Sequence, residues 1–444
     1  MPQTHGREFY VSPSGSDGNS GSPTSPFRSI GRVFTAISDL RGNDTVIVMP
    51  GVYAEQVVVA RGGGPDGYLT LRSQVPHMAK IRSPKNTYSA VNIISSYVTF
   101  EGFDVQAGGN GHGIEATFIG GKSSNNGPHH VRILNNISHH NAGSGIGVAY
   151  GDFYTIDDNI CYANCATNHY QGSGISIYAA RAVPGTDLAF RNFVRRNVCF
   201  DNSIIDLPGD PEPPHSDGNG IIIDDLANSQ SGYPAGTYPF RTLVDSNVAF
   251  HNGGRGVHVF LSDNVTVRNN TCCHNNRDKL NPGTWRGELS NVGSSHTIWV
   301  NNIGFADPAA NRNNTAINEA STAALRSRDV IWKNNLTYDG RPGGASLSLG
   351  EPNVTLSTRA GGNLFGVDPQ FVGREIERAS DLQLRASSPA IDAGTMAFGI
   401  SESDAGGQPR KKGQTVDVGA FEYDGRGQED ANRMDAPGGA AQQP

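Results

Sequence analysis

Several kinds of residue are scarce in this chain of 444 residues, and each scarcity excludes a class of protein. Charged residues make up only 17% of the sequence, and the net charge of −7 gives no general attraction to nucleic acid. No apolar run reaches the roughly 18 residues that a membrane-spanning helix needs. We therefore expect neither a nucleic-acid partner nor a membrane span.

Cysteine is also scarce, with five residues, and the odd number argues against a disulfide framework. Cys161, Cys199 and Cys272 each lie two residues after an asparagine of the repeat described next, so we expect them to stack as interior thiols. A zinc site at Cys161 and Cys165 is not favoured, because no second cysteine pair stands at ligand spacing. Lysine is scarcer than arginine, at 7 against 28 residues, and arginine is the side chain that binds carboxylates through two parallel hydrogen bonds.

Asparagine, in contrast, returns at intervals that suit one turn of a solenoid. The gaps between successive repeat asparagines are 23, 38, 50, 23, 32 and 33 residues, and each asparagine closes a short apolar strand, at Asn136, Asn159, Asn197, Asn247, Asn270, Asn302 and Asn335. Strand-rich repeats of roughly 20–50 residues indicate coils that contact only their neighbours. The pattern predicts an all-β, single-domain parallel β-helix, whose long faces suit an extended polymer.

A glycine before an alternating strand marks the same coils, at Gly113, Gly145, Gly174, Gly220 and Gly256. Because side chains alternate along a strand, the second and fourth residues after each glycine are expected to point outward. Stacking then brings Tyr178, Asp224 and His258 together on one face. Insertions at about 181–191, 202–217, 227–240 and 277–286 are expected to wall a cleft beside this face.

The two ends of the chain differ from the repeat. Residues 30–40 have helical spacing, with Ser29 as the expected N-cap, and a helix there would cover the open end of the first coil. We therefore predict a strand and capping helix in residues 1–44, coils in 45–340, further coils and a closing segment in 341–423, and a disordered tail in 424–444. The closing segment is expected to cover the far end.

Particular segments resemble the pectate-lyase-like superfamily of right-handed parallel β-helix proteins. They are Phe9-Tyr-Val-Ser-Pro-Ser-Gly-Ser-Asp-Gly, Ser25-Pro-Phe-Arg-Ser-Ile, Pro50-Gly-Val-Tyr, the asparagine repeat, Ser388-Pro-Ala-Ile-Asp-Ala-Gly and Gly419-Ala-Phe-Glu-Tyr. The resemblance covers most of the chain and implies that the parallel β-helix is right-handed. It leaves activity open, because this superfamily holds polysaccharide lyases, glycoside hydrolases, C5-epimerases, carbohydrate esterases and non-catalytic binders.

The segment from His215 to Asp225 is the densest in groups that can do chemistry. We expect catalytic roles for residues of this segment and of the outward rows beside it, namely Asp224, His258, His215, Tyr178 and Arg255. Side chains on the same face or its rim are expected to bind substrate: His169, Arg241, Glu115 and Lys122. Three carboxylates suit a hard cation, so Asp217, Asp224 and Asp225 are predicted to hold Ca²⁺.

Three functions remain open. The preferred hypothesis is a lyase that cleaves an acidic polysaccharide by β-elimination, with His258, His215 or an arginine as base and Tyr178 as acid. A glycoside hydrolase would need two carboxylates, and Asp224 and Asp225 resemble the paired aspartates of polygalacturonases, although the rest of that pattern is missing. A C5-epimerase or a non-catalytic binder is the third hypothesis, and a binder would need more aromatic platforms than Tyr150, Tyr178 and Phe260.

The location of the protein is predicted from these functions rather than from a leader. Enzymes that act on polysaccharides work outside the cytoplasm, so we expect an extracellular or periplasmic protein. The opening residues, Met1 to Glu8, lack the features of a secretory signal. The chain is therefore cytoplasmic, exported without a cleaved leader, or written here without one, and the sequence does not indicate its oligomeric state.

Overall fold

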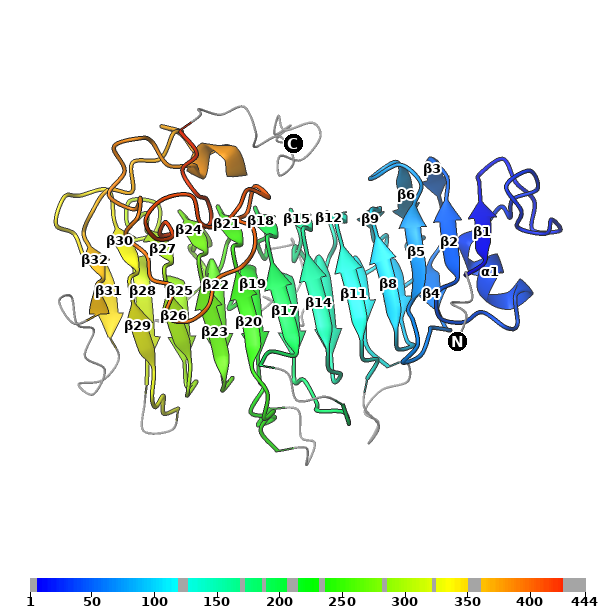
Figure 1. Cartoon of the computed structure of the whole chain (residues 1–444), viewed down its shortest axis with the longest axis horizontal. Coiled ribbons are helices and arrows are strands. Elements are labelled where there is room, and N and C mark those ends of the chain that lie inside the picture. Colours follow the sequence, from blue (N-terminus) through cyan, green and yellow to red (C-terminus); the bar gives the residue numbers. More distant parts are fainter. Residues whose placement is uncertain are drawn as a thin grey trace. The chain divides into compact units, whose positions relative to one another are not determined.

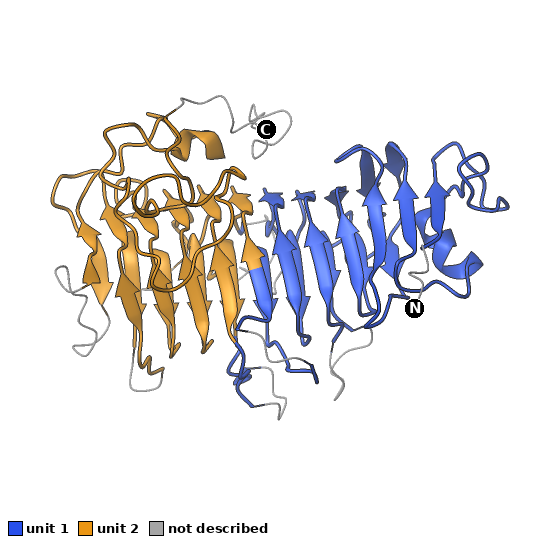
Figure 2. Cartoon of the chain, in the orientation of Figure 1, with its two compact units in different colours: residues 1–193, 204–214, 225–240 blue, residues 194–203, 215–224, 241–444 orange. Residues whose placement is uncertain are grey.

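The computed structural model describes residues 6–118, 127–167, 172–185, 189–205, 215–230, 236–281, 286–321, 325–349 and 361–425. These residues form two units, which Figure 2 shows in different colours. Unit 1 comprises residues 1–193, 204–214 and 225–240, and unit 2 comprises residues 194–203, 215–224 and 241–444. None of the described helices is long and apolar enough to span a membrane.

In unit 1 the chain winds through three parallel sheets, adding one strand to each sheet in every coil (Figure 1). The first sheet contains β1 (Glu8–Val11), β2 (Thr45–Val48), β5 (Leu69–Ser73), β8 (Val98–Glu101), β11 (Val131–Leu134) and β14 (Tyr154–Asp157). The second contains β3 (Gly51–Tyr53), β6 (Ala79–Arg82), β9 (Asp104–Gln106), β12 (Ile137–His139) and β15 (Ile160–Tyr162). The third contains β4 (Val57–Val59), β7 (Val91–Ile93), β10 (Ile114–Ala116), β13 (Ile146–Ala149) and β16 (Ser173–Tyr178).

Unit 2 repeats this arrangement, and β17 (Asn192–Arg195) lies where the chain passes from unit 1 to unit 2. Its first sheet contains β20 (Thr242–Asp245), β23 (Val265–Arg268), β26 (Ile298–Val300) and β29 (Ile331–Lys333). Its second contains β18 (Val198–Phe200), β21 (Val248–Phe250), β24 (Thr271–Cys273), β27 (Ile303–Phe305), β30 (Leu336–Tyr338) and β32 (Leu364–Phe365). Its third contains β19 (Asn219–Asp224), β22 (Val257–Phe260), β25 (Gly287–Val292), β28 (Thr315–Ala320) and β31 (Leu347–Leu349).

The core of each unit consists of apolar side chains stacked at equivalent positions of successive coils. In unit 1, Ile114 pairs with Ile146, which pairs with Ile175, and all three are fully buried. In unit 2, Val257 pairs in the same way with Leu289. Burying such a side chain is worth about 1.5–3 kcal/mol, so every coil stabilises the next. Cys161, Cys199 and Cys272 are buried, as predicted, and they form no disulfide.

The asparagine repeat forms a buried hydrogen-bonded ladder at the corner between the first and second sheets. In unit 2, Oδ1 of Asn247 accepts from the backbone N–H and the Nδ2 of Asn197, both from the coil before it. The same pattern runs on through Asn270, Asn302 and Asn335 to Asn363. In unit 1, Asn136 donates to Asn159 in this way. The ladder satisfies backbone donors that the corner would otherwise leave unpaired.

A second ladder, which the repeat did not predict, lies between the second and third sheets. In unit 2 it runs from Asn202 through Asn252 to Asn275 and ends at Glu288. Asn141 and Asn164 form the equivalent pair in unit 1. These asparagines follow the first set by five residues, so the spacing of the second ladder is the same as that of the first.

The predicted capping helix is present as α1 (Ile30–Ala36), which packs against β4, but its N-terminus is capped differently from the prediction. Ser29 is the N-cap residue, yet its hydroxyl donates to Asp17 and caps no helical N–H. The Glu55 carboxylate instead accepts from the backbone N–H groups of Ile30 and Gly31, at 2.8 and 2.9 Å. A carboxylate satisfies these donors and also interacts favourably with the helix dipole.

The C-terminal segment of unit 2, after β32, includes a short 3₁₀ helix, η1 (Ala379–Leu382), and binds to the turns of the coils. Asn301 exchanges two hydrogen bonds with the backbone of Thr395, while Asn334 donates to the Ala393 carbonyl. Both asparagines have positive φ, which asparagine tolerates better than most residues. These bonds fasten the segment along a corner of the coils. Its predicted role of covering the far end stays a prediction.

Candidate functional site

Unit 2 contains a compact group of charged and polar side chains around the turn that leads into β19. The turn residue Asp217 accepts a hydrogen bond from Nδ2 of Asn219 at 2.8 Å. Oδ1 of Asn219 in turn accepts from the backbone N–H of Arg255 at 2.9 Å. Arg255 directly precedes Gly256, the marker glycine before β22. The Arg255 guanidinium also donates to the carbonyl of Ser216. These bonds fix Asp217 and Arg255 relative to each other.

A histidine–aspartate pair lies at the start of the same turn. Nδ1 of His215 is 2.6 Å from Oδ2 of Asp278, and both side chains are largely buried. The other carboxylate oxygen of Asp278 accepts from the backbone N–H of Leu280. Asp278 therefore fixes the orientation of the ring, and when Nδ1 carries the proton of the neutral ring, the lone pair is on Nε2.

A second arginine completes the group. Arg286, which precedes β25, is 5% exposed and donates through Nη1 to Oδ1 of Asn311 at 2.9 Å. Asn311 donates back to the carbonyls of Asn276 and Asp278, so it links the arginine to the segment that carries the aspartate. Nε of Arg286 is buried without an acceptor among the residues that the structure describes. A buried guanidinium N–H with no acceptor is costly, and it indicates a place for an anion or a water.

Burial and mutual interactions shift the pKa values of the group. Burial raises the pKa of Asp217 above its ordinary value, even though the charge of Arg255 opposes this shift. Burial lowers the pKa of both arginines, Asp217 opposing the shift at Arg255 and Asp278 opposing it at Arg286. Ser216 and Asp217 are partly exposed, so the group reaches the surface there. Two buried cations beside one protonatable carboxyl group suit a ligand that carries negative charge.

His258, from β22, lies beside this group. Burial and the charge of Arg255 hold the pKa of His258 well below its ordinary value, so the ring is neutral at neutral pH. Nδ1 lies 3.4 Å from the Ser290 carbonyl, and the ring stacks against Phe260. His258 was predicted to point outward by register, and the structure buries it to 3% exposure.

No protein-family profile matches the sequence, and no curated protein is similar enough in sequence to be a relative. Solved structures do match the fold. A structure of the pectate lyase Pel9A has a TM-score of 0.53 and 18% sequence identity, and the alignment covers 95% of this chain and 97% of that one. The chain has a right-handed parallel β-helix fold, like this pectate lyase.

A second match is the PL6 family alginate lyase AlyGC, with a TM-score of 0.50 and 13% sequence identity. That alignment covers 98% of this chain but only 59% of the alginate lyase, so the alginate lyase contains a large part without a counterpart here. These similarities establish the β-helix fold. They do not determine the activity, which has to be inferred from the residues of the site.

Two of the three aspartates predicted to hold Ca²⁺, Asp217, Asp224 and Asp225, have other hydrogen-bond partners in the structure. Asp225 belongs to unit 1, is fully buried, and caps a turn by accepting from the backbone N–H groups of Ser229 and Gln230. Among the described residues no group of three or more His, Cys, Asp or Glu side chains could hold a metal ion. Asp225 has the common turn-capping role of aspartate, and Asp217 is held by Asn219 beside the cation Arg255. Calcium binding by the three aspartates stays a prediction that these contacts do not favour.

The other predicted residues are distributed over both units. Asp224 is the last residue of β19, pairs in register with Phe260 and is partly exposed. Tyr178 is the last residue of β16 in unit 1, where its ring makes an edge-on contact with Tyr150. Arg241 precedes β20 of the first sheet and donates weakly to Thr266 and to the carbonyl of His296, at 3.4 Å each. Arg241 thus belongs to a different sheet of the β-helix from His258.

Glu115 lies on the third sheet of unit 1, pointing outward as predicted, and its carboxylate accepts from the Ser89 hydroxyl at 2.7 Å. His169 and Lys122, the remaining predicted substrate-binding residues, lie outside the described residues. Their predicted roles stay predictions.

Sequence reasoning missed Asp278 and Arg286, although it identified their segment, residues 277–286, as an insertion. Nothing in the spacing pairs Asp278 with His215, because the two residues come from different coils and lie 63 positions apart. The signal that could have found them is the charge of the insertion itself, which contains Arg277, Asp278, Lys279 and Arg286 within an otherwise weakly charged chain.

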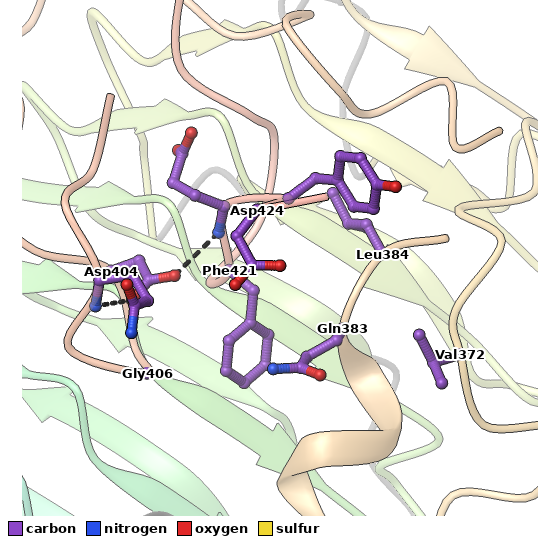
Figure 3. A pocket seen from close by; sticks show the side chains of 10 residues that line it. Val372, Gln383, Leu384, Asp404, Gly406, Phe421 and Asp424 are labelled. Carbon is purple, nitrogen blue, oxygen red and sulfur yellow. Dashed lines mark hydrogen bonds between the residues drawn. The ribbon is translucent and has the colours of Figure 1, made fainter. Parts of the chain in front are cut away.

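Unit 2 also has a cavity in its C-terminal segment, lined by residues that include Gln383, Asp404 and Phe421 (Figure 3). None of its lining residues belongs to the group around Arg255. Asp404 uses its two carboxylate oxygens to accept from the backbone N–H groups of Gln408 and Glu422. Glu422 accepts from the buried Arg410 at 3.1 Å. These carboxylates hold the segment together, so the cavity is a poor candidate for the functional site.

Proposed function

We propose that this protein is a carbohydrate-active enzyme, a lyase that cleaves an acidic polysaccharide by β-elimination. The proposed site is the group in unit 2 that contains His215, Asp217, Arg255, Asp278 and Arg286. It acts on a uronate residue, whose carboxylate the two arginines bind. The protein's location is then outside the cytoplasm, where such polymers occur.

The observation that carries this proposal is the buried Nε of Arg286, which has no acceptor among the described residues. A uronate carboxylate would supply the missing acceptor, and arginine matches the planar carboxylate with parallel hydrogen bonds. Arg255 adds a second buried positive charge. Neutralising the carboxylate acidifies the proton at C5 of the sugar, because the negative charge that develops on removing this proton spreads onto the carboxylate.

His215 is the proposed base. Its Nδ1 is directed at Asp278, so Nε2 takes the C5 proton and the resulting imidazolium is stabilised by the adjacent carboxylate. The electrons of the C–H bond form the C4–C5 double bond, and the bond from C4 to the glycosidic oxygen breaks. Asp217, whose pKa burial raises, is the proposed acid that protonates the leaving oxygen. The products are an unsaturated uronate end and a new reducing end.

Two further observations support elimination over hydrolysis. Asp278 accepts from both His215 and the backbone N–H of Leu280, so neither oxygen is suited to act as the nucleophile of a retaining glycosidase. The matched structures with the higher TM-scores are those of a pectate lyase and an alginate lyase. A glycoside hydrolase, a C5-epimerase and a non-catalytic binder are the alternatives that the experiment must separate.

Calcium dependence is a separate prediction. The residues expected to hold Ca²⁺ do not suit it, because Asp225 caps a turn and Asp217 lies beside Arg255. No step of the proposed mechanism uses a metal ion.

The experiment incubates the full chain with polygalacturonate, alginate and rhamnogalacturonan, each with and without EDTA. The ultraviolet absorbance of the unsaturated uronate product and the number of new reducing ends are followed together. We expect both signals to rise in parallel on one of these polymers. New reducing ends without the absorbance would show hydrolysis, and neither signal on any polymer would contradict the proposal.

A variant pair links the reaction to the site. His215→Gln keeps a polar side chain opposite Asp278 and should lower the elimination rate by about 10²-fold or more, the usual contribution of a general base. His296→Gln, at a histidine whose side chain is 52% exposed, is the matched control and should leave the rate unchanged. Equal rates for both variants would exclude His215 as the base.

A further inference from the structure

Unit 1 carries a second set of polar groups, which the proposed reaction does not use. It lies on the outward side of β7 and β10 in the third sheet, where Asn92 and Glu115 are neighbours in register. We propose that this set, together with Tyr88, binds a neutral sugar residue through its hydroxyl groups. We call it the Glu115 site, and it consists of Gln56, Tyr88, Ser89, Asn92, Glu115 and His112.

The Glu115 site is held in place by a buried side chain. Ser89 is fully buried, and its hydroxyl donates to Oε2 of Glu115 at 2.7 Å and accepts from the backbone N–H of His112 at 3.0 Å. Asn92, with its amide oriented to suit both neighbours, donates to Oε2 of Glu115 at 3.2 Å and accepts from Gln56 at 3.3 Å. One oxygen of Glu115 is thus fixed by two donors.

A ligand could use two acceptor atoms of the site, Oε1 of Glu115 and Oε1 of Gln56, and one donor, the Nε2–H of His112. Oε1 of Glu115 and Oε1 of Gln56 have no hydrogen bond among the residues that the structure describes, and both side chains are partly exposed. Nδ1 of His112 accepts from the backbone N–H of Ser144 at 2.9 Å, so the proton of the neutral ring is on Nε2. Burial holds the pKa of His112 below its ordinary value, which keeps the ring in this neutral form.

These polar atoms lie beside an aromatic ring. Tyr88 is 42% exposed and makes an edge-on contact with the His112 ring, with 6.0 Å between ring centroids. Gly147 of the next coil lies next to the His112 ring, since a Cβ there would be in van der Waals contact with the ring at 3.4 Å. Vicinal hydroxyls that donate to carboxylate and amide oxygens, with a ring face against an aromatic side chain, are the features of a bound sugar.

The charge of the site selects against a uronate. The carboxylate of Glu115 would repel a sugar carboxylate, whereas hydroxyl groups can donate to it. The Glu115 site thus differs from the group around Arg255 and Arg286 in unit 2, whose two cations suit an acidic sugar. This inference concerns binding and does not depend on the proposed elimination.

The experiment titrates the full chain with galactotriose, mannotriose, xylotriose and trigalacturonate by isothermal calorimetry. The three neutral probes have no carboxylate and cannot undergo the proposed elimination, so failure of one proposal is distinguishable from failure of the other. We expect at least one neutral trisaccharide to bind. Absence of binding by all three would overturn the inference.

Variants locate the binding. Glu115→Gln removes the charge, Tyr88→Ala removes the exposed ring, and each should weaken the neutral probe about tenfold or more, whereas Val52→Ala, at an exposed residue of the second sheet, should not. Tyr88 is well exposed, so its variant should fold even if Glu115→Gln does not. Unchanged affinity in both site variants, or trigalacturonate binding that Glu115→Gln weakens, would overturn the assignment.

Discussion

Nδ1 of His215 lies 2.6 Å from Oδ2 of Asp278, although 63 positions separate the two residues in the sequence. The pair joins the turn before β19 to the segment before β25, because stacking of coils brings such turns together. Both side chains are buried, and Arg286 lies on the same segment as Asp278. Variants at these positions distinguish a catalytic role of the pair from a purely structural one.

Asp278→Asn is predicted to lower the rate of elimination by about 10²-fold while the protein stays folded. An amide can present its NH₂ group to Nδ1, which places the proton of the neutral ring on Nε2, where it cannot act as a base. The measurement is the pH profile of kcat/KM, because a purely structural role of Asp278 would not shift the apparent pKa values of that profile. Leu280→Ala, at an exposed neighbour, is the control. A profile identical to that of the parent protein would exclude a positioning role for Asp278.

Arg286→Lys is predicted to raise KM for an acidic polymer by about tenfold or more, because an ammonium group lacks the planar pair of donors. The dependence of binding on ionic strength should change little, because lysine keeps the positive charge. Arg312→Lys changes an exposed arginine that interacts with Arg286 through space. Both variants replace a guanidinium group by an ammonium group. An equal rise in KM in the two variants would therefore argue against direct contact between Arg286 and the substrate.

Asn247→Ala is predicted to destabilise unit 2 strongly. It leaves the buried backbone N–H and Nδ2 of Asn197 without their shared acceptor, and each such loss costs about 1–3 kcal/mol. Chemical denaturation measures the effect as a lower midpoint. Asn313→Ala, at an exposed asparagine outside the ladder, should change stability by less than about 0.5 kcal/mol. Comparable losses in the two variants would mean that the ladder adds little stability.

The fold could be predicted from the sequence because the residue that stabilises each corner, an asparagine, recurs once in every coil. Each coil needs an acceptor at the same corner, so Asn136, Asn159 and their successors recur at coil-length intervals that are visible without coordinates. The site has no such period. Asp278 contacts His215, and Arg286 is linked to Asp278 through Asn311, only because irregular insertions stack on one another. The sequence pattern does not determine the paths of these insertions.

Individual roles were also harder to predict than positions. Asp225 was expected to bind a metal because carboxylates do so, but its turn supplies three backbone and hydroxyl donors that use both oxygens. His258 was placed correctly on its strand, yet its burial depends on what packs over the outward side of β22. Alternation of side chains predicts a direction and does not predict whether that direction leads to solvent.

Glu288 makes stability depend on pH, because burial raises its pKa to about 8 in the folded chain. Between the ordinary value of 4.5 and about 8, the folded state holds a proton on Glu288 that the unfolded state has lost. The contribution of Glu288 to the free energy of unfolding is therefore largest below pH 4.5, and it falls as the pH rises toward 8. Buried Glu319 and Glu422, each with a pKa raised to about 7, should act in the same direction.

Glu288→Gln separates this titration from the packing of the residue. Glu288 accepts from the backbone N–H and Nδ2 of Asn275 and from Nδ2 of Asn314, and an amide offers only one acceptor oxygen to these three donors. The variant should thus be less stable at every pH, with a shallower fall in melting temperature between pH 5 and pH 8 because the titrating group is gone. Glu377→Gln, at an exposed glutamate, should leave both the stability and the slope unchanged. If Glu288→Gln kept the full slope of the parent protein, the pH dependence would have to come from the other buried carboxyl groups.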